Sequence, residues 1–340
     1  MNFFEFDITI VGGGCVGASI LHELTRRGYG NVGLIDHGRA TVSATSNSGG
    51  MLRVFHEHSE HVRLALGSHT RLKALQQSGV LTENPPANGS LYFFNKARYE
   101  RYKENLELMN GAEYPFEVYT TVCGRKYFPQ FRWGDDEWAI YEPLGSALSP
   151  RVFSENLIAA GTRAGATVID GFEVQRLSRY RDHYRISAAD ATVTTNTLIL
   201  AGGARLLPRL RDLGLSLPLE AKTLSTFSAE KTRKDVLPNY LDRETLDFAC
   251  LGRGTDLTFA NAAGPRTLDR YWLEPYKKTT AEDCYAPNRI GYSGQVAGLP
   301  QLSLATGWGG TGFKFALEVG QRVAGSIERH SPGRTMYALS

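Results

Sequence analysis

The first forty residues carry the pattern that most constrains what this chain can fold into. An apolar, β-branched run, Phe6–Val11, predicts a strand that is buried on both faces. It leads directly into Gly12–Gly17, whose sequence GGGCVG fits G-x-G-x-x-G, and apolar residues at helical spacing follow. A second apolar run, Val32–Ile35, ends on Asp36. A strand, a glycine turn, a helix and a second strand that ends on an acid predict a binding site for an adenine dinucleotide.

Each part of this pattern has a physical role in such a site. Gly12 permits the sharp turn from strand to helix, Gly14 allows a pyrophosphate to approach the backbone, and Gly17 allows the helix to pack closely on the strand. The helix start offers N–H groups and a positive dipole end to the phosphates. Asp36 can accept hydrogen bonds from the ribose hydroxyls and would repel a 2′-phosphate, so NADP is the least suitable dinucleotide. The motif alone leaves FAD and NAD open.

Composition and charge argue against several other classes of protein. The net charge of +3 comes without a basic run, so no nucleic-acid partner is expected. No apolar stretch reaches the ~18 residues that a membrane helix requires, so no membrane span is expected. The four cysteines form no C-x-x-C pair, and His56, His58 and His61 lack an acidic ligand set, so no metal site is predicted. The amino terminus lacks the features of a signal peptide, which favours a cytoplasmic location.

The rest of the chain favours FAD over NAD. After Asp36 the sequence leaves the simple strand–helix alternation of an NAD domain and enters a small, polar, glycine-rich stretch, Ala44–Arg53. Much later, a pair of alternating strands is expected around Phe172–Leu177 and His183–Ala188, and the predicted strand Thr197–Leu200 that follows them ends in the sequence AGGA. Near the end, Gly307–Phe315 is a glycine-dense turn that leads into a helix expected from about Ala316. Glycine-rich turns at helix starts form sites for anions or carbonyl oxygens.

Five segments, in this order along the chain, resemble the FAD-dependent D-amino-acid oxidase superfamily: Gly12–Gly17, Asp36, Ala44–Arg53, Leu200–Ala204 and Gly307–Lys314. The resemblance spans residues 7–326 and is strongest to the branch that contains glycine oxidase and monomeric sarcosine oxidase. It implies an α/β fold in which a Rossmann-type FAD-binding domain is interleaved with a mixed or antiparallel-sheet substrate domain. The FAD-binding domain is expected in residues 1–85, 145–210 and 285–340, and the substrate or partner domain in residues 86–144 and 211–284.

The resemblance also implies where FAD binds. Ala44–Gly50 should lie along the pyrophosphate and the isoalloxazine, the Val174 backbone should touch adenine, and Gly309–Lys314 should lie along the pyrimidine end of the flavin. Because a reduced flavin becomes anionic around N1 and C2=O, a cation such as Lys314 near that end favours reduction. The alternative for Lys314 is an exposed lysine at a helix start. The expected FAD contacts are Gly12, Gly14, Cys15, Val16, Gly17, Asp36, His37, Ala44, Thr45, Ser46, Asn47, Ser48, Gly49, Gly50, Met51, Val174, Ala201, Gly202, Gly203, Gly309, Gly310, Thr311, Gly312, Phe313 and Lys314.

The candidates for catalysis are Arg53, Tyr285 and Trp308 on the substrate side, with Lys314 beside the flavin. The resemblance matches Arg53 to an active-site arginine of sarcosine oxidase, and its guanidinium could bind a carboxylate with two parallel hydrogen bonds. Alternatively, Arg53 is a structural arginine that pairs with a buried carboxylate such as Glu142.

Several positions depart from the family pattern or leave two interpretations open. In amino-acid oxidases of this family the arginine of a G-L-R-P segment holds the substrate carboxylate, and Ala286 occupies its place here. The lysine that activates oxygen in sarcosine oxidase has no clear counterpart, since neither Lys222 nor Lys231 matches it. Cys284 lies near the cysteine that sarcosine oxidase links to its flavin, but a buried free cysteine is usually a small hydrophobe. Cys15 is expected to be a packing residue.

The sequence therefore predicts an FAD-dependent oxidoreductase that oxidises the C–N bond of a small amine or amino-acid-like substrate by hydride transfer to flavin. The alternative is an enzyme that acts on a partner protein. The superfamily includes flavoproteins needed to build the cysteine tryptophylquinone of a partner amine oxidase, and Ser48–Arg53 resembles that subgroup. The missing carboxylate arginine would suit a site open to such a quinoprotein precursor. A third possibility is a flavin-binding subunit without a substrate site of its own.

Overall fold

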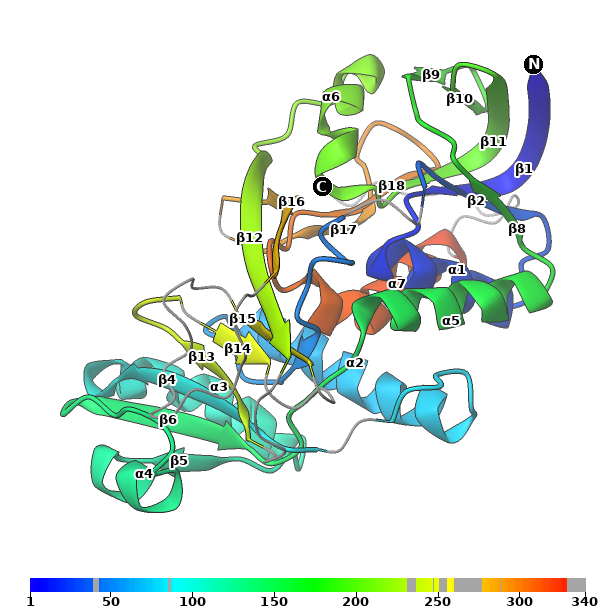
Figure 1. Ribbon diagram of the computed structural model, residues 1–340. Coiled ribbons are helices and arrows are strands. Elements are labelled where there is room, and N and C mark those ends of the chain that lie inside the picture. Colours follow the sequence, from blue (N-terminus) through cyan, green and yellow to red (C-terminus); the bar gives the residue numbers. More distant parts are fainter. Residues whose placement is uncertain are drawn as a thin grey trace. The chain divides into compact units, whose positions relative to one another are not determined.

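The structure of the protein is a computed structural model, shown in Figure 1. It describes residues 1–38, 43–84, 87–230, 237–246, 248–250, 256–259, 277–287 and 289–328. Lys231 lies outside these ranges, as do parts of the expected segments 211–284 and 285–340. The chain divides into two compact units. The first comprises Met1–Ser46, Phe153–Thr223 and Glu282–Ser340, and the second comprises Asn47–Val152 and Leu224–Ala281.

The first unit is built on a sheet with the strand order β17-β18-β11-β1-β2-β8, and the β9–β10 hairpin pairs with β11. From β18 to β8 the neighbouring strands are parallel, while β17 is antiparallel to β18. Both strands predicted from the first forty residues are present, and both are buried where the sequence is apolar. The strands of this sheet are β1 (Asn2–Val11), β2 (Val32–Asp36), β8 (Thr167–Asp170), β9 (Arg176–Arg179), β10 (Tyr184–Ser187), β11 (Ala191–Leu200), β17 (Tyr292–Gln295) and β18 (Leu302–Thr306).

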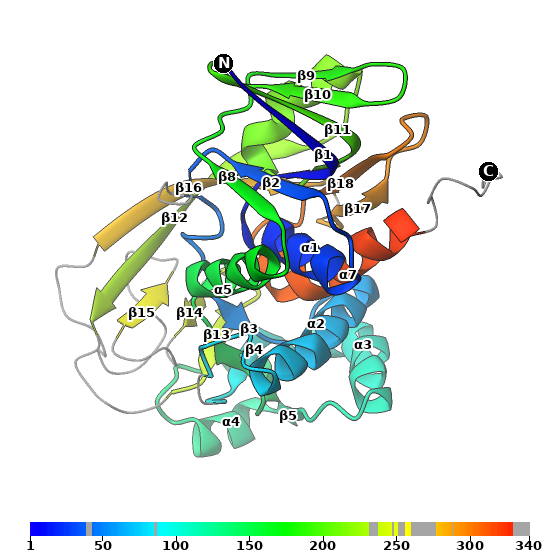
Figure 2. The same ribbon diagram turned by 90° about the vertical axis from the view of Figure 1, so that its right-hand side faces the viewer.

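Three helices, α1 (Cys15–Arg26), α5 (Pro150–Arg163) and α7 (Gly312–Glu328), lie together on one side of this sheet (Figures 1 and 2). They pack closely because small residues stand where they cross. A Cβ atom on Gly320 of α7 would lie 2.8 Å from the carbonyl carbon of Ser19 on α1, too close for any side chain. Apolar residues of the β9–β10 hairpin and of the segment after β11 pack with those of β1 and β11 in one core. That segment comprises η2 (Gly203–Leu206), α6 (Leu207–Leu210) and η3 (Arg211–Leu213).

Most of a mixed sheet of order β16-β12-β15-β14-β13-β4-β6-β5 belongs to the second unit, while β12 up to Thr223 and β16 from Glu282 are counted with the first. In this sheet β13 and β4 are parallel and the other described pairs are antiparallel. An aromatic core that includes Phe93, Trp133 and Tyr240 fills one face. A two-stranded sheet pairs β3 with β7. The elements are β3 (Met51–Leu52), α2 (Ser59–Gln77), β4 (Ser90–Asn95), η1 (Lys96–Arg98), α3 (Tyr99–Gly111), β5 (Glu117–Tyr119), α4 (Thr121–Tyr127), β6 (Glu137–Glu142), β7 (Ser146–Ala147), β12 (Glu220–Glu230), β13 (Asn239–Asp242), β14 (Phe248–Cys250), β15 (Asp256–Phe259) and β16 (Lys277–Tyr285).

Three details differ from the sequence-based expectation. The first strand of the predicted pair around Phe172–Leu177 and His183–Ala188 begins only at Arg176, because the Phe172 N–H bonds to the carbonyl of Asp36 instead of a hairpin partner. The last helix begins at Gly312, a turn earlier than expected. The expected segment 1–85 divides between the two units after Ser46. Among the described helices, none has the length and apolar content that crossing a bilayer demands.

Candidate functional site

The carboxyl ends of five parallel strands meet at one edge of the first unit's sheet. The glycine turn at Gly12 follows β1, and Asp36 ends β2. Phe172 comes shortly after β8, Ala201 follows β11, and Gly307 follows β18. Ligands of parallel α/β sheets bind outside this edge. The fold therefore gathers several of the segments that the sequence assigned to the cofactor.

Backbone segments approach one another at this edge so closely that two positions accept only glycine. Gly12 has a φ of 110°, and a Cβ atom there would lie 2.6 Å from the Gly202 Cα atom. A Cβ atom on Gly17 would overlap the carbonyl oxygen of Gly12. The turn after β1, the first turn of α1 and the turn after β11 are thus in direct contact, as close packing of helix on strand requires.

The start of α1 is capped by a hydroxyl group from a later segment of the chain. The Thr45 Oγ1 atom accepts a hydrogen bond from the Cys15 N–H at 3.2 Å and lies 3.6 Å from the Cys15 sulfur. Gly14, the N-cap residue, has no side chain that could do this. Burial raises the pKa of the Cys15 thiol to about 11, so the group is neutral and packs as a small residue. A neutral cap leaves the positive end of α1 available to an anion.

Asp36 is held by backbone donors on both of its oxygens. Its Oδ2 atom accepts a hydrogen bond from the Gly13 N–H at 2.7 Å, and its Oδ1 atom accepts one from the Gly38 N–H at 2.9 Å. The Nδ1 atom of His37 lies 3.5 Å from Oδ1. Each carboxylate oxygen can accept more than one hydrogen bond, so ribose hydroxyls can still bind. Val174, the expected adenine contact, is partly buried in the stretch that follows β8.

A second glycine turn joins β18 to α7. Gly307, Gly309 and Gly310 have φ values of 96°, 36° and 65°, which side chains rarely tolerate. The Gly309 N–H donates to the Cys284 carbonyl at 2.9 Å, which ties the turn to the end of β16. The ring of Tyr285 covers Gly309 so closely that a Cβ atom there would overlap it. The backbone of this turn is therefore fixed by β16 before α7 begins.

Asp283 is a residue at this turn that the sequence reasoning missed. Its Oδ2 atom accepts a hydrogen bond from the Gly310 N–H at 2.5 Å, and its Oδ1 atom accepts one from the Cys284 N–H at 2.8 Å. Burial raises the pKa of its carboxyl group, while the two N–H groups act in the opposite direction. Lys222, which has no role in the sequence-based prediction, places its Nζ atom 5.2 Å from the centre of the Tyr285 ring and 3.0 Å from Glu220.

The predicted segment from Ala44 to Met51 divides between the two units. Ser46, in the first unit, is exposed and bonds to the neighbouring Ser43. Asn47, in the second unit, is buried and accepts hydrogen bonds from the Thr226 hydroxyl on both its carbonyl and its side chain. A Cβ atom on Gly49 would lie 2.6 Å from the Cys250 sulfur, and one on Gly50 would overlap the Leu148 carbonyl. Packing alone therefore requires glycine at positions 49 and 50, independently of any ligand.

Arg53 is buried in the second unit, and part of its guanidinium makes no hydrogen bond. It is 7% exposed, its Nη1 donates to the Phe55 carbonyl, and its guanidinium carbon lies 5.0 Å from the centre of the Tyr92 ring. Its Nε atom is buried without a hydrogen-bond partner. Glu142 makes no ion pair with it, because that carboxylate accepts the N–H groups of Val54 and Phe55 at 2.5 and 3.1 Å. Glu142 acts on Arg53 only as a charge at longer range.

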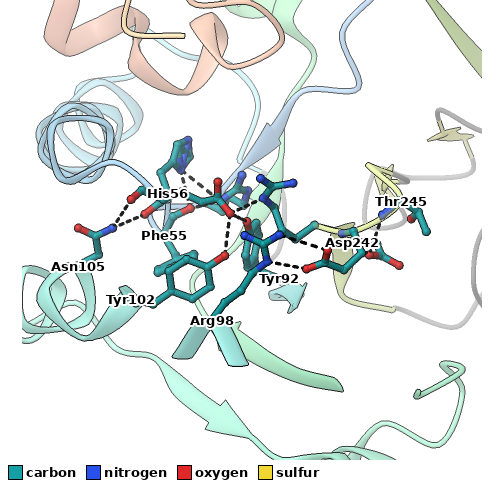
Figure 3. A network of polar contacts seen from close by, with 12 residues as sticks. Phe55, His56, Tyr92, Arg98, Tyr102, Asn105, Asp242 and Thr245 are labelled. Carbon is teal, nitrogen blue, oxygen red and sulfur yellow. Dashed lines mark hydrogen bonds and ion pairs between the residues drawn. The ribbon is translucent and has the colours of Figure 1, made fainter. Parts of the chain in front are cut away.

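A network of polar contacts joins the segment after Arg53 to Tyr92, Tyr102 and Asn105 (Figure 3). Glu57 Oε1 accepts hydrogen bonds from the hydroxyls of Tyr92 and Tyr102 at 3.0 and 2.7 Å and pairs with Arg243. These donors keep the pKa of Glu57 below its usual range, although burial alone would raise it. Asn105 donates to the carbonyls of His56 and Glu57 at 2.9 and 2.8 Å and so fixes the chain after Arg53. The Tyr92 ring under the arginine is therefore anchored at its hydroxyl end.

The remaining candidates are mostly buried. Trp308 is 4% exposed and its ring packs against Gly291. Cys284 is 2% exposed, and burial raises the pKa of its thiol above the usual value, which makes it a poor nucleophile. Phe313 packs edge-on against Phe153. Thr311 donates its hydroxyl to the Trp308 carbonyl, and Lys314 is the third residue of α7. Within the described ranges, no group of His, Cys, Asp or Glu could hold a metal ion.

Comparisons with known proteins identify the family. Its model, described as FAD dependent oxidoreductase (DAO), matches residues 7–264. Monomeric sarcosine oxidase of Streptomyces avermitilis is 25% identical over 228 residues, 65% of this chain and 58% of that protein. N-methyl-L-tryptophan oxidase of Yersinia pseudotuberculosis is 23% identical over 222 residues, 61% of this chain and 56% of that protein. The matches thus span little more than half of these relatives. Glycine oxidase from Geobacillus kaustophilus shares the fold, with a TM-score of 0.81, 19% identity, and 97% and 96% of the two chains covered.

The residues at the sheet edge fit the cofactor of that family. Two helices begin there at glycine turns, glycines at positions 12 and 17 let backbone segments approach closely, and Asp36 keeps acceptor capacity for a ribose. FAD is thus both the cofactor of the family and one that the described residues can hold. The chain belongs to the DAO family of FAD-dependent oxidoreductases.

Proposed function

We propose that the protein oxidises the C–N bond of an amine or amino-acid-like substrate and that Arg53 binds the carboxylate of that substrate. The family supports the flavin chemistry, and two of the relatives are named for N-methyl amino acids. The observation that carries the substrate class is the buried Arg53 guanidinium, whose Nε–H has no partner.

Burial of an arginine without a complete set of acceptors costs free energy. An unsatisfied buried donor costs ~1–3 kcal/mol, and a buried cation costs more unless an anion is close. Among the described residues, no carboxylate lies within ion-pair distance of Arg53, whose contacts are the Tyr92 ring, the Phe55 carbonyl and the Nδ1 atom of His56 at 3.2 Å. A substrate carboxylate would supply both the missing acceptor and the missing charge, and arginine is the side chain best shaped to bind it.

FAD, when bound, supplies the hydride acceptor. We propose that the first unit holds its nucleotide part through the turn at Gly12–Gly17 and Asp36, and that Gly309–Lys314 lies along the flavin pyrimidine. Asn47–Met51 of the second unit is proposed to contact the flavin as well. Because hydride transfer needs an oriented, unprotonated amine, the task left to the chain is to hold the substrate and keep water out. The four free cysteines suit a reducing compartment, and we propose a cytoplasmic location.

One observation favours the second candidate, an enzyme acting on a partner quinoprotein precursor during cysteine tryptophylquinone biosynthesis. Ala286, which stands where the amino-acid oxidases carry a carboxylate-binding arginine, is 3% exposed and bonds through its N–H to the Gly307 carbonyl. A free amino acid would thus have one arginine fewer to bind it. A polypeptide substrate needs no carboxylate at the reacting residue, so the absence of this arginine would not weaken its binding.

Anaerobic reduction of the bound flavin distinguishes the two. We expect sarcosine or N-methyl-L-tryptophan to bleach the flavin, and dimethylamine, which is sarcosine without its carboxyl group, to do so far more weakly. Arg53→Met should raise the apparent KM for the carboxylate substrate at least ~10-fold, the size of one lost charged hydrogen bond, and leave dimethylamine unchanged. If no simple amine bleaches the flavin while co-expression matures a quinoprotein precursor, the second candidate replaces the first.

A further inference from the structure

Asp283 places a carboxylate at the position where an anionic cofactor is expected. Both of its oxygens accept backbone N–H groups, from Gly310 at 2.5 Å and from Cys284 at 2.8 Å. Gly310 belongs to the turn that starts α7, and the N–H groups of such a turn are those that a family flavin would use. The Asp283 carboxylate thus accepts a hydrogen bond from an N–H group that could otherwise donate to the cofactor.

The charge of Asp283 also reaches the other glycine turn. Burial is the main cause of the raised pKa values of Cys15, the first residue of α1, and of its neighbours Cys284 and Tyr285, and the Asp283 charge acts on all three in the same direction. The two helix starts that the sequence assigned to FAD therefore share one negative charge. A phosphate or a reduced flavin at either helix start would be repelled by it.

Among the described residues, no lysine or arginine makes an ion pair with Asp283, and the factors that set its pKa are burial and the two N–H groups. The charged and titratable groups nearby include Cys15 on α1, Cys284 and Tyr285 on β16, Glu282 beside it, Arg289 in the following turn, Lys222 over the Tyr285 ring and Lys314 in the first turn of α7.

We propose that Asp283 couples FAD binding to proton uptake: the apoprotein holds a carboxylate on the Gly310 N–H, and the complex with FAD favours the neutral carboxylic acid. The inference rests on the placement of the flavin pyrimidine along Gly309–Lys314 given above, and it adds a residue that this placement did not include. The protonation step takes one proton from solvent onto the Asp283 carboxylate, and no bond to the cofactor forms.

The sign of the effect follows from linkage. An acid whose pKa is higher in the complex than in the apoprotein binds a proton when the ligand binds. The affinity for FAD is then greatest at pH values below the apoprotein pKa, falls as the pH rises through the interval between the two pKa values, and levels off above it. Within that interval the slope approaches a ~10-fold loss of affinity per pH unit.

The test is titration of the full-length apoprotein with FAD from about pH 5 to about pH 8.5, a range above the usual Asp pKa, with quenching of flavin fluorescence as the readout. We expect the wild-type Kd to rise with pH. Asp283→Asn and Asp283→Ser, which keep an oxygen acceptor for the Gly310 N–H without the charge, should bind FAD at least ~5-fold more tightly at the upper end and lose most of the slope.

Glu282→Gln is the matched control, since Glu282 is the adjacent carboxylate and its side chain is exposed. It should follow the wild-type curve. The inference is overturned if both neutral variants keep the wild-type slope, or if both bind FAD more weakly at every pH, which would make Asp283 a structural anchor. Since the measurement contains no substrate, its failure is separate from that of the proposed amine oxidation, which is read from flavin bleaching.

Discussion

The two helices that begin at glycine turns in the first unit are capped in opposite ways. At α1, the neutral hydroxyl of Thr45 accepts the Cys15 N–H. At α7, the Asp283 carboxylate accepts the Gly310 N–H. Both acceptors come from segments distant in sequence. They differ in charge and in the donor that they accept, since Cys15 is the first residue of α1 whereas Gly310 lies two residues before α7 begins.

That difference separates two functions that a helix start can have. A helix N-terminus carries roughly half a positive elementary charge, and a neutral cap leaves that charge available to a phosphate. A carboxylate cap stabilises the helix by ~0.3–1 kcal/mol but offsets the charge. The α1 start thus has the properties of a binding surface, whereas the α7 start binds an anion well only when Asp283 is neutral.

The largest effect is expected from filling the backbone contact on which the α1 start depends. Gly17→Val would place its Cβ atom onto the Gly12 carbonyl oxygen, and the whole turn after β1 would have to move. We expect a loss of several kcal/mol of stability, in the range of severe core overpacking, and no measurable FAD binding. Thermal unfolding and FAD titration measure the two effects.

Gly30→Ala is the control for this change. A Cβ atom on Gly30 meets nothing within 4 Å, so the variant should unfold near the wild-type temperature and bind FAD normally. If Gly17→Val bound FAD as tightly as Gly30→Ala, the turn after β1 would not be the cofactor site.

The contrast also shows what the sequence could and could not predict. The turn after β1 is local: Phe6–Val11, the glycines and Asp36 lie within one short βαβ unit, so pattern alone located the strand, the helix start and the acid. The family resemblance located the α7 turn as well. The turn after β1 follows from neighbours in sequence, whereas the α7 turn is held by Cys284 and Tyr285 at the end of β16, and its helix begins a turn earlier than expected.

Asp283 could not be found by the same reasoning. Its partner Gly310 is 27 residues away, and the contact exists because β16 ends beside the β18–α7 turn. The Glu57 network in the second unit depends likewise on residues as distant as Arg243. Such contacts follow from tertiary packing, for which one sequence contains no periodic signal. The alternative pairing of Arg53 with Glu142 is absent for a related reason, since that carboxylate accepts hydrogen bonds from the backbone N–H groups of Val54 and Phe55.

Replacing the neutral cap of α1 by a charged one should have a smaller effect than Gly17→Val. We expect it to raise the stability of the apoprotein and to lower its affinity for FAD. Thr45→Asp would place a carboxylate at the start of α1, as Asp283 does in the turn before α7. We expect the apoprotein to gain up to ~1 kcal/mol from the charged cap, while FAD binds at least ~10-fold more weakly because the new charge faces its pyrophosphate. Urea unfolding of the apoprotein and FAD titration test this pair of expectations.

Thr45→Asn separates charge from shape in that experiment. Asparagine has the size of aspartate and is also a good cap, so it should keep the stability without the loss of FAD affinity. Equal loss in both variants would mean that the shape of residue 45, and not its charge, controls FAD binding at α1.

The smallest effect is the pH dependence of the apoprotein's own stability, and it tests the α7 cap without any ligand. Because burial raises the pKa of Asp283 in the folded protein above its unfolded value, the folded state binds the proton more strongly. The stability that this group contributes is therefore present at low pH and declines as the pH rises from the unfolded pKa of about 4 through the folded pKa. Glu142, which burial shifts in the same direction, adds to the decline in both wild type and variant.

Asp283→Asn should thus lose less stability between about pH 4 and pH 7 than the wild type, measured by urea unfolding at each pH. An identical decline in the two proteins would show that the Gly310 and Cys284 N–H groups fully offset the burial of the carboxylate. The α7 start would then be as available to an anion as the α1 start.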